Sequence, residues 1–364
     1  MTPSAPLAAR RVFLAATGQN RGKTTASLGL IAGFSLAGHR LGFLKPVGQR
    51  YLVVDGTRAD EDAILIREVC GLSDALNDMS PVTLPRHFTT DYIMGKVYED
   101  LPAQVLGAFA RVAAGKDLVV IEGTGHAGVG AVVGLSNAAA AALLESKVII
   151  VSEGGIGRPI DEIVLNASLF EHHGVEVIGA IVNKVDLGTH PDAPEILRRG
   201  LAQHRIDLIG CIPFSDLLAN PSLELIVTHL DGELLSGVAA PGKTIGQVVI
   251  GAMQAEHAVA FFRDRTLVIT PGDRQDLVRA AIAAGPARVM GLILTGGFRP
   301  PDDVLSELRA ANLFAFLVGT DTLTTAQAAN AILVKTHPTD VEKIATIIDL
   351  VSRSIDIGAL LARL

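Results

Sequence analysis

Short apolar runs recur along the first part of the chain, and segments of helix length separate them. The runs occupy residues 12–16, 41–44, 118–121, 148–151, 177–182 and 208–212. Continuous runs of Val, Ile and Leu are typical of parallel strands that are buried on both faces of a sheet. Because strands and helices alternate, the pattern predicts an α/β fold with a doubly wound parallel sheet.

A second, smaller α/β pattern follows. Runs 266–270, 289–295 and 314–318 predict strands, and segments 274–284 and 302–311 predict helices. Glycine and proline are frequent between residues 230 and 259, which indicates a connector with short structured pieces. We therefore predict two domains, residues 1–240 and residues 241–364. Apolar residues at helical spacing predict a further helix over 340–350.

Polar and glycine-rich segments follow the predicted strands of the first domain. They occupy residues 17–25, 45–47, 122–126, 152–155 and 183–186. Ligands of doubly wound sheets bind at the carboxyl ends of the strands. These segments are therefore expected to meet at one edge of the sheet and to form the functional site.

The segment 17–25, Thr-Gly-Gln-Asn-Arg-Gly-Lys-Thr-Thr, lies between a predicted strand and a predicted helix. This is the context of a phosphate-binding loop. Thr17 occupies the usual first glycine position, so Gly18, one residue later, is expected to supply the turn. The alternative is a glycine-rich turn with a surface lysine. We expect Lys23 to reach the β- and γ-phosphates and the Thr24 hydroxyl to bind Mg²⁺. The predicted nucleotide-binding residues of the loop are Gly18, Asn20, Gly22, Lys23, Thr24 and Thr25.

Two charged residues end predicted strands near this loop. Glu122 follows an apolar run, which is where an acid can hold Mg²⁺ opposite the loop hydroxyl. Lys45 ends the run 41–44 and could neutralise a phosphoryl group or a substrate carboxylate, or could simply be exposed. Asp60 could bind a metal or only complement a helix dipole.

The segment 183–186 reads Asn-Lys-Val-Asp and fits the pattern N-K-x-D, whose aspartate can accept hydrogen bonds from guanine. A four-residue pattern with one free position arises often by chance. Asn183 is therefore preferred as a contact to the nucleotide base, and we expect ATP rather than GTP.

Composition excludes several classes of function. Net charge is −7, aromatic residues make up 4% and Trp is absent, so nucleic-acid binding is not expected. Mean hydropathy is +0.41, yet no apolar run is long enough to cross a membrane. Two cysteines cannot form a disulfide framework, and the amino end lacks the apolar core of a signal peptide. We therefore expect a cytoplasmic protein.

The first 240 residues resemble the dethiobiotin synthetase-like P-loop domain at the amino end of long bacterial phosphotransacetylases and, more distantly, cobyrinic acid a,c-diamide synthase. The motifs that carry this resemblance are the loop 17–25, Lys45-Pro46-Val47, Asp62-Ala63, the glycine-rich segment 122–130, segment 154–158, Asn183-Lys184 and Ile212-Pro213. The resemblance implies that Thr24, Asp62 and Glu122 share Mg²⁺. It also implies that Lys23 and Lys45 flank the transferring phosphoryl group, and that Asn183 contacts adenine.

The second domain resembles the DRTGG domain that follows in the same phosphotransacetylases, through segments 269–274, 292–297 and 320–325. Together the two resemblances imply an ATP- and Mg²⁺-dependent protein that hydrolyses ATP or phosphorylates a small carboxylate-bearing substrate. The alternative is a nucleotide-sensing regulatory module. A small-molecule substrate or effector and a homo-oligomer are the expected partners. Segments 270–274, 295–297 and 320–322 are expected to form a ligand or interface surface without a second catalytic centre.

Overall fold

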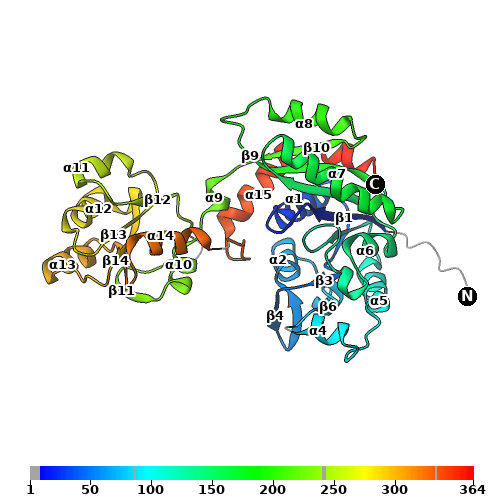
Figure 1. Cartoon of the computed structure of the whole chain (residues 1–364), viewed down its shortest axis with the longest axis horizontal. Coiled ribbons are helices and arrows are strands. Elements are labelled where there is room, and N and C mark those ends of the chain that lie inside the picture. The colour runs from blue at the N-terminus through cyan, green and yellow to red at the C-terminus, as the bar shows by residue number, and fades with distance from the viewer. Residues whose placement is uncertain (1–8, 86, 240–242, 333) are drawn as a thin grey trace, which may run out of the picture. The chain divides into compact units, whose positions relative to one another are not determined.

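The computed structural model describes residues 9–85, 87–239, 243–332 and 334–364. The chain forms two compact units (Figure 1). The first unit comprises residues 1–214 and 345–364, and the second comprises residues 215–344. Within the part of the chain that the structure describes, every helix is too short or too polar to span a bilayer.

The first unit contains a six-stranded sheet in the order β10-β9-β8-β1-β7-β2, and all neighbouring strands are parallel. The strands are β1 (Arg10–Ala16), β2 (Leu41–Leu44), β7 (Leu118–Glu122), β8 (Lys147–Glu153), β9 (Val177–Val185) and β10 (Leu208–Pro213). Each apolar run of the sequence lies within one of these strands. The prediction of a doubly wound parallel sheet is therefore confirmed.

Helices connect the strands of the first unit. They are α1 (Lys23–Leu36), α2 (Glu61–Cys70), α3 (Leu76–Met79), α4 (Phe88–Ile93), α5 (Leu101–Ala113), η1 (Ala131–Val133), α6 (Asn137–Leu143), α7 (Gly157–His172) and α8 (Ala193–Ala202). Two small sheets, which the sequence did not reveal, join β3 (Val47–Gly48) to β6 (Val82–Thr83) and β4 (Tyr51–Val54) to β5 (Thr57–Asp60).

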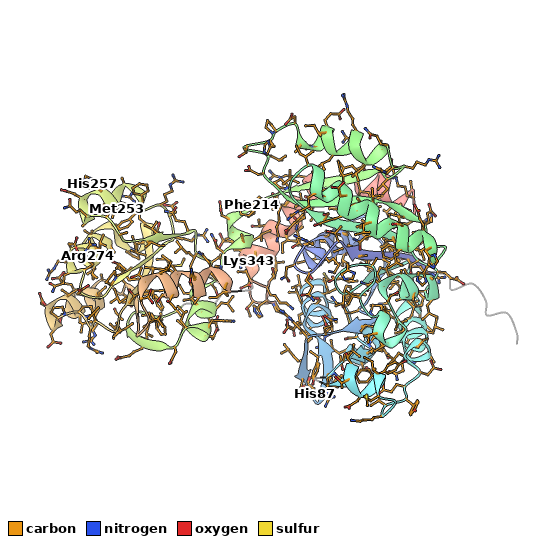
Figure 2. All side chains as sticks on the ribbon, in the orientation of Figure 1. His87, Phe214, Met253, His257, Arg274 and Lys343 are labelled. Atoms are coloured by element: carbon orange, nitrogen blue, oxygen red, sulfur yellow. The ribbon has the colours of Figure 1, made fainter. Side chains whose placement is uncertain are left out.

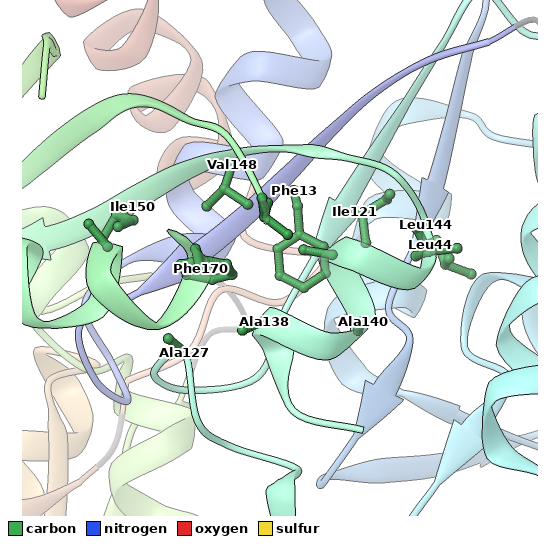
Figure 3. Packing of buried hydrophobic residues seen from close by; sticks show 14 of the residues in the cluster. Phe13, Leu44, Ile121, Ala127, Ala138, Ala140, Leu144, Val148, Ile150 and Phe170 are labelled. Atoms are coloured by element: carbon green, nitrogen blue, oxygen red, sulfur yellow. The ribbon is translucent and has the colours of Figure 1, made fainter. Parts of the chain in front are cut away.

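The core of the first unit lies between the sheet and its helices (Figure 3). Phe13 of β1 and Phe170 of α7 are fully buried, and their ring centroids lie 6.5 Å apart. Val148 and Ile150 of β8 pack into the same cluster. Burial of these side chains fixes the strand ends, and with them the loops that carry the polar segments.

The second unit contains a five-stranded sheet in the order β11-β15-β14-β13-β12, with only β11 antiparallel to its neighbour. Its strands are β11 (Gly232–Ser236), β12 (Gln247–Ile250), β13 (Thr266–Pro271), β14 (Val289–Thr295) and β15 (Phe314–Val318). Its helices are α9 (Asp216–Ala219), α10 (Leu223–His229), α11 (Ala255–Ala258), η2 (Val259–Phe261), α12 (Gln275–Arg288), α13 (Asp302–Ala310) and α14 (Thr322–Ala331). The α/β character predicted for this part is confirmed, and β11 and β12 show that the expected connector supplies two strands of the sheet.

The predicted boundary between residues 240 and 241 lies outside the described residues, and the structure divides the chain at a different place. The second unit begins at Ser215, and the carboxyl end of the chain returns to the first unit. Helix α15 (Val341–Ser354) contains the predicted helix 340–350 almost entirely, and α16 (Ile357–Leu361) follows it. A Cβ atom at Gly29 of α1 would lie 2.4 Å from Val351 Cβ, so α1 and α15 pack closely against each other at this point.

Candidate functional site

The predicted phosphate loop connects β1 to α1. Helix α1 begins at Lys23, and Gly22 occupies the N-cap position with φ +91° and no side-chain cap. The first N–H groups of this helix are therefore available to an anion, which the positive end of the helix dipole attracts. Asn20 also has a positive φ of +59°, whereas Gly18 does not. The left-handed turns of the loop are thus at Asn20 and Gly22, and not at Gly18 as the sequence suggested.

The end of β9 holds this loop in place. The Asn183 side-chain amide donates to the Arg21 carbonyl at 3.2 Å, and Lys184 Nζ donates to the Asn20 carbonyl at 2.9 Å. A Cβ atom at Gly22 would lie only 1.8 Å from Asn183 Nδ2. Asn183 is buried and supports the loop backbone. Its expected contact with a nucleotide base remains a prediction.

Four side chains predicted from different segments converge beside the loop. Lys45 Nζ lies 2.5 Å from Asp62 Oδ2 and 3.0 Å from Glu122 Oε1. The Thr24 hydroxyl lies 3.1 Å from both Asp62 Oδ1 and Glu122 Oε1, and its single proton can serve one of them at a time. Lys45 is only 3% exposed. The alternative of an exposed lysine at this position is therefore wrong.

Burial and charge shift the two lysines in opposite directions. Burial, and second the positive charge of Lys45, lower the pKa of Lys23 to about 8. Burial would also lower the pKa of Lys45, but Asp62 and Glu122 outweigh it and raise that pKa well above its ordinary value. Lys45 therefore carries its charge at every physiological pH. Among the described residues, the nearby charges act on Lys23 without a side-chain hydrogen bond to it, so its ammonium group can serve a ligand.

The residues present fit a magnesium ion. Glu122 is fully buried, and its Oε2 atom has no hydrogen-bond partner. A buried carboxylate oxygen without a hydrogen-bond partner is unfavourable unless a ligand binds to it. Thr24, Asp62 and Glu122 offer the hard oxygen atoms that Mg²⁺ prefers. Among the described residues, no group of three or more His, Cys, Asp or Glu side chains is arranged to hold a metal.

Asp60 and Asp186 have structural roles in this arrangement. Asp60 caps α2, because its Oδ1 accepts the Asp62 N–H at 3.0 Å, and burial raises its pKa to about 6. Asp186 Oδ1 accepts the N–H groups of Gly188 and Thr189 at 3.1 and 3.0 Å. The carboxylate of Asp186 thus closes its own turn. Thr25, which was predicted to contact the nucleotide, lies half-buried in the first turn of α1.

Sequence reasoning missed a second charged network that contacts the loop at Thr17 and Arg21. Glu153, at the end of β8, pairs with Arg21, with Arg158 at 3.3 Å and with Lys184 at 3.1 Å. Glu162 of α7 accepts from the Thr17 hydroxyl at 2.8 Å and pairs with Arg21 at 3.5 Å. The position of Glu153 after a predicted strand was a usable signal, but Glu162 lies within a helix and gave none.

The fold and the loop define a P-loop NTPase-like α/β domain followed by a second, smaller α/β domain. A family model described as an AAA domain, AAA_26, matches residues 10–222, and a model of the DRTGG domain matches residues 225–332. The chain therefore belongs to the AAA_26 family and carries a DRTGG domain behind it. The resemblance stated from the sequence motifs is confirmed.

Curated relatives of the chain are phosphate acetyltransferases. The enzyme of Nitrosomonas europaea is 29% identical over 309 residues, which cover 81% of this chain and 43% of the relative. The enzyme of Pseudomonas aeruginosa is 31% identical over 315 residues, with 81% and 43% covered. The enzyme of Pseudomonas putida is 28% identical over 368 residues, with 94% and 50% covered. The chain thus spans about half the length of the curated relatives it matches.

Two solved structures are similar at low scores. The septum site-determining protein MinD of Pyrococcus horikoshii, complexed with Mg-ADP, is 15% identical with a TM-score of 0.35 and covers 58% of this chain and 83% of its own. The CBS and DRTGG domains of a Clostridium perfringens pyrophosphatase are 23% identical with a TM-score of 0.28, covering 36% and 62%. Scores of this size support no inference about function.

Proposed function

We propose that the first unit binds a nucleoside triphosphate with Mg²⁺, ATP in preference to GTP, and hydrolyses it or transfers its γ-phosphoryl group to a small carboxylate-bearing substrate. The observation that carries the proposal is the convergence of Lys45, Thr24, Asp62 and Glu122 beside the loop. Three of these groups are oxygen ligands, and one of them has an unpartnered buried oxygen. Such a cluster is expected where charge develops on transferring phosphoryl oxygens.

Each residue has a role that follows from its position. Lys23 lies at the start of α1 with a free ammonium group, so it would neutralise phosphate oxygens directly. The positive charge of Lys45 offsets the repulsion between the carboxylates of Asp62 and Glu122. It would also add a second cation beside the phosphoryl group. Thr24, Asp62 and Glu122 would hold Mg²⁺, which when bound neutralises phosphate charge. Positioning and electrostatics would therefore supply most of the rate acceleration.

The variant Lys23→Ala tests this proposal. It should abolish Mg-ATP binding measured by calorimetry and Mg-ATP-dependent phosphate release, while its circular dichroism and melting temperature stay close to those of the parent. Lys96→Ala is a matched control, because the Lys96 side chain is 65% exposed and, among the described residues, forms an ion pair only with Asp91. Unchanged affinity and turnover in a folded Lys23→Ala variant would overturn the proposal.

The second candidate function is a nucleotide-sensing regulatory module. It is supported by the fact that the matching relatives are twice as long and that the match covers only one half of them. A sensor must bind its ligand with different affinities in two states. Phosphate release is the discriminating measurement. Release that depends on an added metabolite mixture supports an enzyme, and tight Mg-ATP binding with negligible release under all conditions supports a sensor.

Assembly as a homo-oligomer and a cytoplasmic location belong to the same proposal. Light scattering at working concentration tests the assembly, and a monomer throughout the range would contradict it.

A further inference from the structure

The ammonium group of Lys45 lies among the oxygen atoms that are expected to bind Mg²⁺. Its Nζ atom is 2.5 Å from Asp62 Oδ2, 3.0 Å from Glu122 Oε1 and 3.9 Å from Asp60 Oδ1. The Thr24 hydroxyl lies 3.1 Å from Asp62 Oδ1 and 3.1 Å from Glu122 Oε1, so it contacts two of the same carboxylates. A metal ion held by Thr24, Asp62 and Glu122 would therefore use carboxylates that already interact with Lys45.

The sheet fixes the backbone of Lys45 at this place. Leu44 of β2 and Ile121 of β7 are register partners, and both belong to the buried cluster of Figure 3. Lys45 and Glu122 follow them directly in the chain, so the two side chains start from adjacent strand ends. The Lys45 N–H donates to the Met79 carbonyl at 2.7 Å. Rotation of side-chain torsions can therefore move the ammonium group while the backbone stays in place.

The charges of this cluster nearly balance without a metal ion. The carboxylates of Asp60, Asp62 and Glu122 act on the ammonium groups of both Lys45 and Lys23. Three carboxylates and two ammonium groups leave one net negative charge, and Mg²⁺ alone would turn it into one net positive charge. Repulsion between cations is strong in a largely buried site, because little water screens it. A triphosphate supplies the negative charge that removes this repulsion.

The geometry also opposes simultaneous binding of the ammonium group and the ion. Mg²⁺ takes its oxygen ligands at about 2.0–2.1 Å in a nearly octahedral arrangement. A carboxylate that approaches the ion this closely cannot keep Lys45 at hydrogen-bond distance without placing two cations side by side. Glu122 Oε2 has no hydrogen-bond partner, so the lysine satisfies only one oxygen of this carboxylate. Lys45 is 3% exposed and needs another anionic partner once the carboxylates bind the ion.

We propose that Lys45 makes the site selective for the metal–nucleotide complex over the free divalent cation. Its ammonium group competes with free Mg²⁺ for Asp62 and Glu122, and it releases these carboxylates when the ion binds together with a triphosphate. Lys45 then exchanges carboxylate oxygens for phosphoryl oxygens. The exchange rests on the proposed function, whereas the competition between Lys45 and a divalent cation requires no nucleotide.

Mn²⁺ is the probe for this competition, because it prefers the same oxygen ligands as Mg²⁺ and its binding is measured by water-proton relaxation. Lys45→Met replaces the ammonium group by an uncharged side chain of similar length. Without nucleotide, the folded variant should bind Mn²⁺ at least about tenfold more tightly than the parent, because the competing charge is gone. Lys45→Gln should show the same rise if Lys45→Met does not fold. Equal affinity in parent and variant would overturn the proposal.

Two further variants separate competition for the oxygen atoms from a general charge effect. Lys23→Met is the matched control, since it removes the other buried ammonium group, which acts on the carboxylates through space. It should raise Mn²⁺ affinity less than Lys45→Met does, and an equal rise would show that charge alone limits metal binding. Adding Glu122→Gln to Lys45→Met should abolish the gain, and a gain that persists would place the metal elsewhere.

A crystal structure of the parent with Mg²⁺ and a non-hydrolysable ATP analogue gives a readout that needs no variant. Lys45 Nζ should lie beyond hydrogen-bond distance of Asp62 Oδ2 and beside a phosphoryl oxygen. A lysine that still contacts both carboxylates with the ion bound would overturn the exchange.

The outcomes also separate this inference from the proposed function. If Lys45→Met gains Mn²⁺ affinity but the parent binds no nucleotide, the proposed function fails and the competition stands. If the parent binds Mg-ATP but removal of the Lys45 charge brings no gain in Mn²⁺ affinity, the proposed function stands and this inference fails.

Discussion

Lys45, at the end of β2, and Glu122, at the end of β7, form a buried ion pair with 3.0 Å between Nζ and Oε1. The two residues are 77 positions apart in sequence, yet β2 and β7 are neighbours in the sheet. Glu122 is fully buried and Lys45 nearly so. Burial would lower the pKa of Lys45, but the carboxylates of Asp62 and Glu122 outweigh it and raise that pKa above its ordinary value. The same ion pair therefore contributes both to the stability of the first unit and to the candidate functional site.

The variant Lys45→Ala should therefore destabilise the first unit. It leaves Asp62 and Glu122 close together without their cation, and breaking a buried pair lowers the free energy of unfolding by about 3–5 kcal/mol. Added Mg²⁺ should restore part of this loss, because the ion would take the place of the lysine charge. Denaturant titration with and without Mg²⁺ measures both effects.

Lys96→Ala is the control for this titration, since its exposed pair with Asp91 contributes about 0–1 kcal/mol. If Lys45→Ala does not fold, Glu122→Gln provides the second readout: this variant should lose the stabilisation by Mg²⁺ that the parent shows. An identical Mg²⁺ response in the parent and in Glu122→Gln would contradict the assignment of Glu122 to the ion.

Gly22→Ala should distort the phosphate loop. The position has φ +91°, and the new Cβ atom would lie 1.8 Å from Asn183 Nδ2. A side chain in this backbone region costs about 1–3 kcal/mol, and the clash adds to it. Nucleotide affinity should fall together with the free energy of unfolding. Gly38→Ala is the matched control, because Gly38 has φ +87° and nothing within 4 Å of the new Cβ atom.

A double variant separates the clash from the backbone strain. Asn183→Ala in the Gly22→Ala background removes the clashing amide, so the two effects should not add. Strict additivity in a double-mutant cycle of unfolding free energies would show that Asn183 and Gly22 are not in contact.

Arg274→Ala should affect the second unit only. Figure 2 labels Arg274 and Met253 in the second unit. Arg274 Nη2 donates to the Met253 carbonyl at 2.8 Å and pairs with Asp276 at 2.8 Å. Loss of these contacts should lower the stability of this unit by about 0.5–1.5 kcal/mol. Phosphate release at the loop of the first unit should persist. A complete loss of turnover in a folded variant would place Arg274 in the active site.

Cys70 and Cys211 should react slowly. Burial raises the pKa of both thiols from 9.0 to about 11. The thiolate is the reactive form, so modification at pH 8 should be roughly a hundredfold slower than in the unfolded chain. Because the folded state holds these protons more tightly, its stability should fall as pH rises from 9 toward 11. Thiol-reagent kinetics in buffer and in urea check this, and equal rates would contradict it.

The sequence by itself determined the six strands of the first sheet, the strands β13, β14 and β15 of the second, the helices α12, α13 and α15, and the place of the phosphate loop. These signals are local. An apolar run such as 148–151 indicates a buried strand, and the glycine-rich turn before Lys23 indicates a tight loop, from neighbouring residues alone. It also indicated that Lys45 and Glu122 would lie at the same edge, since parallel strands end there together. Asp62 was reached only through the family resemblance.

Tertiary structure alone decided the rest. Contacts such as Asn183 to the Arg21 carbonyl, or Glu153 to three cations, join segments far apart in the chain and depend on which strands are adjacent. The return of residues 345–364 to the first unit is of the same kind, because an amphipathic helix shows in its sequence that one face is buried but not which surface buries it. Glu162 illustrates the limit: only the packing of α7 brings its carboxylate to Thr17 and Arg21.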